Sequence, residues 1–413
     1  MKAIIITIGD ELLIGQTIDS NSAWIGAELS GLGFDICRII SVHDKREDII
    51  FTLREVSGKA DIALITGGLG PTSDDITKPT LCEFFNTKLT LDVEVLKMIE
   101  TMTSRRNMPM NENNRKQAEV PELCKVLTNA KGTAPGMWFE KDGTIFVSMP
   151  GVPDEMKYIM TQHVLPSLKQ QFISQVVIHK SIMTYGAFEA KLAEILTDFE
   201  KGLPENVKLA YLPSFGVIKL RLTGVGVNDN QLQKTIHDKV DELYNIIPQY
   251  IYGEDDDTLE KCIGDLLRNK KQTVCSAESC TGGKIASLIT SVFGSSDYFK
   301  GSVVAYANSA KSDILGIPED IMLKYGAVSE DVVCKMAENA RKLFAADYCI
   351  ATSGIAGPNG GSDAKPVGLV WLAVSSQAGV IARKLIFGFD RQTNIQRFSF
   401  AALNLLRKQI INN

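Results

Sequence analysis

The stretch Cys275–Lys284, Cys-Ser-Ala-Glu-Ser-Cys-Thr-Gly-Gly-Lys, constrains the fold of this chain more than any other feature. It follows an apolar run, Gln272–Cys275, and precedes the helical pattern Lys284–Thr290, so it predicts a strand, a tight turn holding Glu278 and Ser279, and a helix. The start of such a helix has unpaired N–H groups and the positive end of a dipole, which favour an anion or an oxyanion. Ser279 is therefore a helix cap or a nucleophile, and capping is the commoner use of serine there.

Residues 1–170 alternate short apolar runs with helical patterns. The apolar runs are Lys2–Ile8, Phe34–Val42, Asp61–Thr66 and Thr144–Ser148, and the clearest helical patterns are Ser20–Gly31 and Arg46–Lys59. Alternation of this kind predicts a parallel sheet covered by helices, with ligands bound at the carboxyl ends of the strands.

Two of these strand ends carry residues that suit a phosphate and a metal. Gly9-Asp10-Glu11 follows the first run, and the loop Gly67–Asp75 follows the third. Backbone amides of a glycine loop can close on an anion, and carboxylates are ligands for hard cations. We expect the residues to share one crevice, with the phosphate held by Gly67, Gly68, Gly70 and Thr72 and a divalent cation held by Glu11, Asp74 and Asp75.

The alternative reading of the loop is a glycine-rich turn with Asp75 near a helix cap, and the sequence leaves both readings open. Asp44 is a weaker candidate, because an aspartate at a strand end is usually a turn residue. The polar segment Asn107–Gln117 is expected to be a mobile loop over the same crevice.

Further along, a boundary near Gln170–Gln175 precedes a small α+β module, Val176–Tyr250, which includes a helix at Asp229–Ile246. Its topology would suit RNA binding, but it has eight basic against nine acidic residues and no basic patch. We interpret it as a spacer or dimerisation unit. The acidic linker Gly253–Asp257 leads to a third domain.

Bulk composition limits the function classes. A chain of 413 residues should form two or three domains, and its net charge of −5 does not favour nucleic acid or an anionic membrane. No apolar run approaches the ~18 residues that span a bilayer, and the N-terminus resembles a first strand more than a signal peptide. The eight cysteines include no Cys-x-x-Cys pair, which predicts reduced thiols and a cytoplasmic location.

Three strand ends rich in small and polar residues meet in the third domain. The first carries Ser279, the second is Tyr306–Lys311, and the third is Thr352–Pro358. All four histidines, His43, His163, His179 and His237, precede this domain, so a nucleophilic Ser279 needs another base. A desolvated lysine can serve, with Lys311 the first choice and Lys284 the second. Thr352–Gly357 suits an oxyanion hole or a phosphate-binding loop. With three such strand ends in one domain, the roles of nucleophile and helix cap are equally supported for Ser279.

These motifs resemble those of the competence/damage-inducible protein A (CinA) family along essentially the whole chain. Gly9–Gly15, Gly67–Asp75 and Pro150–Pro153 are similar to the molybdopterin-binding-like domain of that family, and Val176–Tyr250 is similar to its KH-type domain. Ala277–Gly283, Tyr306–Lys311 and Ser353–Pro358 are similar to its nicotinamide-nucleotide amidohydrolase domain. The resemblance implies an α/β protein with domains at 1–170, 176–252 and 257–413.

For the third domain, the resemblance implies deamidation of nicotinamide mononucleotide to nicotinic acid mononucleotide and ammonia. Ser279 would be the nucleophile and Lys311 its proton acceptor. The remaining implied site residues either position substrate, stabilise the oxyanion, let the backbone approach the ligand or pair with its phosphate: Tyr306, Asn308, Thr352, Ser353, Gly282, Gly283, Gly354, Gly357, Arg391 and Arg397.

For the first domain, it implies hydrolysis of ADP-ribose to AMP and ribose 5-phosphate with a divalent ion such as Mg, Mn or Co, held by Glu11, Asp74 and Asp75. Two alternatives stay open: a pterin-nucleotide binding protein of molybdenum cofactor assembly, and a non-catalytic partner in competence or the DNA-damage response. We expect a homodimer, the commonest symmetric state of such enzymes.

Overall fold

The computed structural model describes residues 1–72, 75–105, 110–172, 176–214 and 216–412. The candidate ligand Asp74 and the start of the segment Asn107–Gln117 lie outside these residues. Contacts divide the chain into two compact units, Met1–His179 with Gly224–Lys234, and Lys180–Thr223 with Thr235–Asn413. None of the helices in the described ranges is both long enough and apolar enough to cross a membrane.

The first unit is built on a six-stranded sheet with the strand order β2-β1-β3-β8-β7-β6. The strands β2, β1, β3 and β8 run parallel, and β7 and β6 add an antiparallel edge. The sheet strands are β1 (Lys2–Ile8), β2 (Asp35–Val42), β3 (Ile62–Thr66), β6 (Lys125–Leu127), β7 (Gly136–Lys141) and β8 (Thr144–Met149). A parallel core explains why the motifs at the ends of β1 and β3 lie at the same edge.

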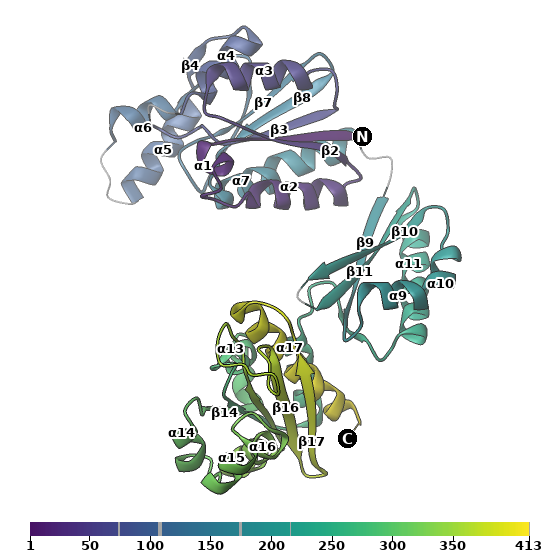
Figure 1. Cartoon of the computed structure of the whole chain (residues 1–413). Coiled ribbons are helices and arrows are strands. Elements are labelled where there is room, and N and C mark those ends of the chain that lie inside the picture. The colour runs from purple at the N-terminus through teal and green to yellow at the C-terminus, as the bar shows by residue number, and fades with distance from the viewer. Residues whose placement is uncertain (73–74, 106–109, 173–175, 215, 413) are drawn as a thin grey trace. The chain divides into compact units, whose positions relative to one another are not determined.

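Helices cover both faces of this sheet (Figure 1). The residues of β1 alternate between the two cores. Ile4 and Ile6 pack on the side of α3 and α4, whereas Ile5 packs on the side of α2 and α7. The other elements of the unit are α1 (Asp10–Leu13), α2 (Ser20–Gly31), α3 (Arg46–Val56), α4 (Thr77–Phe85), β4 (Leu89–Leu91), α5 (Val93–Arg105), α6 (Glu112–Gln117), β5 (Glu119–Pro121), α7 (Pro153–Ile159), a π-helical turn (Met160–Val164) and α8 (Leu165–Phe172).

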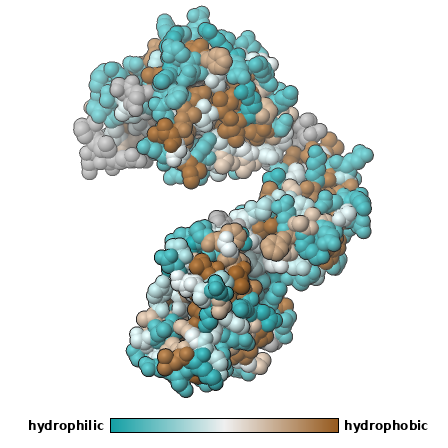
Figure 2. Space-filling view, in the orientation of Figure 1, coloured by the Kyte–Doolittle hydropathy of each residue, from teal (hydrophilic) through white to brown (hydrophobic). Residues whose placement is uncertain are grey.

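The polar segment before β5 is not the loop that its composition suggests. Glu112–Gln117 forms α6, because the side chain of Asn111 accepts a hydrogen bond from the backbone of Asn114 and caps the helix. The expectation of a loop is therefore wrong for this part. The visible surface of the unit in Figure 2 is mostly hydrophilic with separate hydrophobic patches, and its exposed apolar side chains include Ile14 and Ile18.

The middle module is a four-stranded sheet with the strand order β10-β11-β9-β12. Its helix α11 has the bounds that the sequence pattern predicts, Asp229–Ile246. The module comprises β9 (Val176–Tyr185), α9 (Glu189–Ile195), α10 (Thr197–Lys201), β10 (Val207–Ser214), β11 (Val217–Gly226), α11 and β12 (Ile251–Glu254).

The last part of the chain forms a five-stranded sheet with the order β14-β13-β15-β16-β17. β14, β13 and β15 are parallel, so their carboxyl ends meet at one edge, while β16 and β17 are antiparallel. Val274 of β13 packs on the side of α12, α13 and α17, and Cys275 on the side of α16. The elements are α12 (Leu259–Lys270), β13 (Val274–Glu278), α13 (Lys284–Thr290), a 3₁₀ turn (Ser295–Asp297), β14 (Phe299–Val304), α14 (Asn308–Asp313), α15 (Glu319–Tyr325), α16 (Glu330–Leu343), β15 (Tyr348–Gly354), β16 (Leu369–Ser376), β17 (Gly379–Ile386) and α17 (Arg391–Asn412).

Candidate functional site

A cavity of about 200 Å³ lies at the edge where β13, β14 and β15 end. Each strand end contributes polar side chains because parallel strands deliver their carboxyl ends to the same place. The cavity is lined by Ser279, Cys280, Tyr306, Asn308, Lys311, Ala327, Val328, Ser353, Gly354, Ala356 and Arg391. The structure thus brings the predicted nucleophile Ser279 and the predicted base Lys311 into one small cavity.

The helix that follows Ser279 is capped by Glu278, the last residue of β13. The carboxylate is fully buried and accepts hydrogen bonds from the backbone N–H groups of Gly283 (3.0 Å), Ile285 (3.1 Å) and Ala286 (2.8 Å). It also accepts one from the hydroxyl of Thr281 at 2.6 Å. The expectation of free N–H groups at this helix start is wrong, since an internal anion already occupies them.

Because Glu278 caps the helix, Ser279 does not serve as its cap. The residue that precedes α13 is Gly283, which makes no side-chain cap. Ser279 is 9% exposed, and its backbone N–H donates to the carbonyl of Thr352 at 3.0 Å, which ties the turn to β15. The side chain of Ser279 lines the cavity while its backbone holds the turn in place.

Lys311 is a buried amine that has no carboxylate partner in the part of the chain that the structure describes. Its side chain is 2% exposed, and within the described residues it forms no ion pair. Its Nζ donates to the carbonyl of Tyr306 at 3.2 Å. Burial lowers the pKa of Lys311 below the ordinary lysine value. A lysine of this kind has a larger neutral fraction than an exposed one and can accept a proton.

Cys280 is the other potential nucleophile in the cavity. Burial raises the pKa of its thiol to about 12, so the thiol stays protonated at neutral pH. Because the thiolate is the reactive form of cysteine, Cys280 is a poor nucleophile here. The serine remains the better candidate.

Arg391 closes one side of the cavity at the start of α17. One terminal guanidinium nitrogen donates to the carbonyl of Gly357 at 2.8 Å, and the other donates to the hydroxyl of Tyr306 at 3.0 Å. Tyr306 is 60% exposed, and Asn308 is also exposed. These three side chains form a polar rim with a cation that an anionic group of a ligand can approach.

Several predicted site residues do not line this cavity. The side chain of Thr352 is fully buried and shares a hydrogen bond of 2.8 Å with Thr281, so it faces the interior of the turn. Arg397 lines a different cavity, and Lys284, the second choice of base, is exposed on α13. Three glycines that were expected to let the backbone approach the ligand also lie outside the lining: Gly282, Gly283 and Gly357. Each of these glycines has a positive φ, which is sufficient reason for glycine there.

The wall formed by Ala327 and Val328 had no signal in the sequence. Ser353 donates through its hydroxyl to the carbonyl of Ala327 at 2.7 Å. Lys365 donates to the carbonyls of Tyr325 and Val328, both at 2.8 Å, and so ties the loop after β15 to this segment. Glu278 was also missed as a functional residue, although a glutamate placed directly after an apolar strand needs buried partners.

In the first unit, the glycines of the loop after β3 are required by close packing. A Cβ on Gly67 would lie 2.0 Å from the carbonyl oxygen of Ile8, and one on Gly68 would lie 2.1 Å from the hydroxyl of Thr77. A Cβ on Gly70 would lie 2.5 Å from the carboxylate of Asp75. The loop therefore lies against β1 with little free space, as the reading of a tight turn predicts.

The candidate metal ligands do not form a complete set in the described residues. Asp75 accepts hydrogen bonds from Gly70 N–H (2.7 Å), Thr72 N–H (2.9 Å) and the Thr72 hydroxyl (2.5 Å), so both of its oxygens hold the loop. Glu11 is exposed on α1. In the ranges that the structure covers, no three His, Cys, Asp or Glu side chains are grouped as for a metal. The sequence motifs assign no role to His43, whose Nδ1 lies 2.7 Å from Oδ1 of Asp10.

The fold and the cavity define a class of protein with three recognised domains. Residues 4–170 match the profile of the probable molybdopterin binding domain, and residues 179–253 match the damage-inducible protein CinA KH domain. Residues 256–410 match the CinA C-terminal domain.

Full-length relatives specify the family. A CinA-like protein of Cytophaga hutchinsonii is 49% identical over 408 residues, which cover 99% of this chain and 98% of that protein. A CinA-like protein of Flavobacterium psychrophilum is 47% identical over 418 aligned positions, covering 100% and 99%. The chain therefore belongs to the CinA-like protein family. A crystal structure of competence/damage inducible protein CihA from Agrobacterium tumefaciens is 36% identical and covers 38% of this chain and 94% of its own, with a TM-score of 0.36.

Proposed function

We propose that the Ser279 cavity hydrolyses the carboxamide of nicotinamide mononucleotide, giving nicotinic acid mononucleotide and ammonia. The observation that carries the proposal is Lys311, a lysine that is 2% exposed, has no ion pair in the described chain and shares a cavity with a serine. An unpaired ammonium is costly to bury, and this cost favours the neutral amine that a serine nucleophile needs as its base.

In the proposed reaction, Ser279 Oγ attacks the carboxamide carbon while its proton passes to Lys311 Nζ. The tetrahedral intermediate then expels the amide nitrogen, which leaves as ammonia after taking that proton from Lys311. Water, deprotonated by the same lysine, attacks the resulting ester, and the lysine returns that proton to Ser279 Oγ as the ester bond breaks and the nicotinic acid product leaves. These steps use water as the only other reactant and need no metal.

The rim of the cavity supports a nucleotide as the substrate. Arg391 supplies a cation for the phosphate, and Tyr306 and Asn308 offer an exposed ring and an amide beside it. The backbone N–H of Ser279 donates to the carbonyl of Thr352, so it is not free to bind the oxyanion. Ser353 and Gly354 line the cavity at the end of β15 and are our candidates for contacts to the reacting carboxamide.

The test is ammonia release from nicotinamide mononucleotide by the purified full-length protein. Ser279→Ala and Lys311→Met should each lower kcat by at least about a hundredfold, whereas Lys284→Met should leave it unchanged. In the unmodified protein, kcat should rise with pH below the ordinary lysine value of 10.5, because only neutral Lys311 accepts the proton. The variant Lys311→Arg should lose this activity, since arginine stays protonated.

Two results would overturn the proposal. Activity that survives Ser279→Ala would require another nucleophile. If the unmodified protein is inactive, the two alternatives are a pterin-nucleotide binding protein and a non-catalytic partner. A titration with a pterin nucleotide distinguishes them, because only the first should bind it. Near-ultraviolet circular dichroism of each variant shows whether its fold is retained.

For the first domain, we propose hydrolysis of ADP-ribose to AMP and ribose 5-phosphate as a second activity. It is supported by the glycine loop Gly67–Thr72 at the carboxyl edge of the parallel strands, where phosphates bind in such folds. The described residues do not by themselves fit a divalent metal, because Asp75 is used by the loop. We therefore propose Glu11 and Asp74 as the ligands of the divalent cation.

Metal removal tests this second activity. Protein treated with a chelator should not turn over ADP-ribose, and added Mg²⁺, Mn²⁺ or Co²⁺ should restore the formation of AMP. Glu11→Gln should abolish turnover, whereas the matched control Ser279→Ala should leave it unchanged. Turnover in the absence of metal would remove Glu11 and Asp74 from the proposal, and no turnover with any of the three ions would refute the activity.

A further inference from the structure

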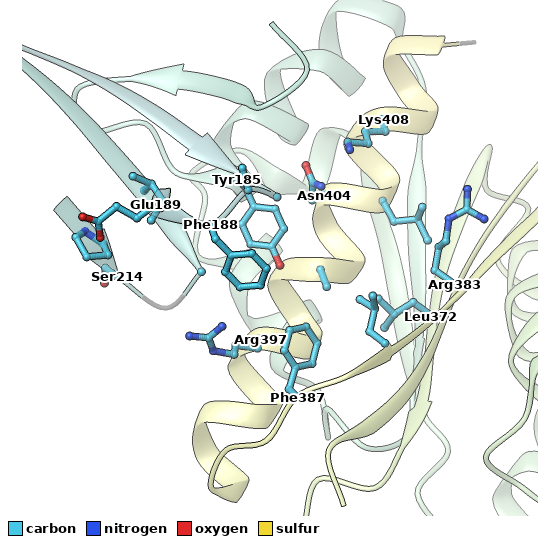
Figure 3. Close-up of a pocket in the computed structure, with 18 of the residues that line it drawn as sticks. Tyr185, Phe188, Glu189, Ser214, Leu372, Arg383, Phe387, Arg397, Asn404 and Lys408 are labelled. Carbon is cyan, nitrogen blue, oxygen red and sulfur yellow. The ribbon is translucent and has the colours of Figure 1, made fainter. Parts of the chain in front are cut away.

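A second and larger cavity, of about 1000 Å³, lies between the middle module and the last domain, within one compact unit (Figure 3). Its walls come from β9 and α9 of the module, from β16 and β17 and from α17. The apolar floor includes Ile218 and Leu372, which are 5% and 1% exposed. The candidate reaction of the Ser279 cavity does not use this space.

Aromatic rings line opposite sides of the cavity. Tyr185 and Phe188 come from the module, and Phe387 and Phe389 come from the segment between β17 and α17. Phe188 is 83% exposed, although a phenylalanine ring gains stability when it is covered. In Figure 3, Tyr185 and Phe188 face Arg397 and Phe387 across the cavity. The arrangement provides flat surfaces on which an aromatic ring can stack.

The charged residues of the cavity are mostly basic. Arg383, Arg397 and Lys408 line it, and Glu189 is the one acidic side chain in its lining. Arg397 is half-buried, and within the described residues its guanidinium forms no ion pair. It lies over the ring of Phe389 at 4.1 Å, and its buried Nε has no hydrogen-bond partner. The Nε is closed to solvent, whereas the half-buried side chain lines the cavity and its terminal nitrogens form no hydrogen bond within the described residues.

Tyr185 adds a neutral donor next to this guanidinium. Burial raises the pKa of its hydroxyl to about 12, so the hydroxyl remains protonated and can donate. On the helix α17, Asn404 is 7% exposed and also lines the cavity. Cationic side chains therefore outnumber carboxylates around an aromatic space.

We propose that this cavity binds a mononucleotide-like anion, an aromatic ring that carries a phosphate. The ring lies among Tyr185, Phe188 and Phe387, and the phosphate meets the guanidinium of Arg397. Arginine binds phosphate with two parallel hydrogen bonds, and the two terminal nitrogens of the guanidinium can donate such a pair. A cavity of this size accommodates a ligand of nucleotide dimensions. The site goes beyond the two proposed activities and does not depend on either.

The experiment measures fluorescence of anilinonaphthalene sulfonate, an aromatic anion, on the full-length protein, beside the uncharged N-phenylnaphthylamine. Arg397→Met should weaken binding of the sulfonate at least about tenfold and leave the uncharged probe unaffected. Ala190→Trp, a substitution of an exposed lining residue, should fill the mouth of the cavity and weaken both probes. Lys300→Met, which removes an exposed charge elsewhere, is the matched control and should change neither.

Displacement identifies the ligand class. AMP should displace the sulfonate probe, and adenosine, which lacks the phosphate, should do so at least about tenfold less well. Unchanged sulfonate binding in both variants would overturn the assignment of the site. Displacement by decanoate but not by AMP would overturn its assignment to an aromatic anion. Each of these readouts is independent of ammonia release and of ADP-ribose turnover.

Discussion

Lys78 in α4 is a buried lysine that neither proposed activity uses. Its side chain is 8% exposed, and its Nζ donates to the carbonyls of Gln117 (2.8 Å) and Glu119 (3.2 Å). These bonds join α4 to the end of α6 and the start of β5. Burial lowers the pKa of Lys78 to about 8.

The lowered pKa of Lys78 predicts a pH dependence of stability. Below pH 8 the amine is charged in both states, and the folded protein bears the cost of burying that charge. Between pH 8 and 10.5 the folded amine is neutral while the unfolded one is still charged, so the free energy of unfolding rises with pH. Relative to Lys78→Met, the unmodified protein should gain about 2 kcal/mol between pH 7 and pH 10.

Urea unfolding followed by Trp24 and Trp138, in a Trp371→Phe background, measures this gain in the first unit. The exposed Lys169→Met is the control and should follow the unmodified protein at each pH. A difference between the unmodified protein and Lys78→Met that is constant with pH would show that the amine keeps its charge when buried.

At the scale of elements, the strand–turn–helix of β13 and α13 is organised by a carboxylate inside the turn. Glu278 collects three backbone N–H groups and the Thr281 hydroxyl, while Thr281 also contacts Thr352 on β15. These bonds set the direction in which the next residue, Ser279, leaves the strand. The glutamate is therefore a positioning residue for the serine.

Glu278→Gln should destabilise the last domain by roughly 2–3 kcal/mol, because an amide replaces an oxygen that accepts several buried N–H groups. Ser279→Ala, one residue later, should change stability by less than about 0.5 kcal/mol, since its hydroxyl has no structural partner in the described chain. Urea unfolding followed by Trp371 fluorescence, in a protein that lacks Trp24 and Trp138, compares the two. Equal stability of both variants would argue against the capping role of Glu278.

At the scale of the whole molecule, α17 connects several parts of its unit. Arg391 at its start lines the serine cavity, and Arg397 lines the larger cavity. Further along, Arg407 is 4% exposed and donates to the carbonyl of Ile251 on β12 at 2.7 Å, and its Nε donates to Asn404 at 3.2 Å. One buried guanidinium thus joins the last helix to the middle module.

Arg407→Met should weaken this connection by about 2–4 kcal/mol, because the Ile251 carbonyl loses a charged donor inside the protein. We expect the backbone amides of β12 and the end of α17 to exchange hydrogen faster, while those of α16 stay protected. Lys408→Met, on the next and exposed residue, is the control. Equal exchange in both variants would mean that apolar packing alone holds the module against α17.

The amino-acid pattern alone predicts the α/β class, the order of the three domains and several element bounds. Lys284–Thr290 and Asp229–Ile246 are helices with the predicted limits. Local propensity and hydrophobic period act between neighbours in the chain, so they can be read without the fold. The motifs at the strand ends were found for the same reason, because in a parallel sheet these ends meet at one edge.

Which of those residues share a cavity depends on the tertiary structure. It placed Ser279 and Lys311 together, turned Thr352 into the interior, moved Arg397 to a second cavity and added Ala327 and Val328 as a wall. These outcomes depend on how segments far apart in the chain pack, and on where each buried polar group finds its partner. Glu278 is an example. Its buried carboxylate needs hydrogen-bond donors, and the backbone N–H groups that donate to it come from the following helix only once the turn has packed.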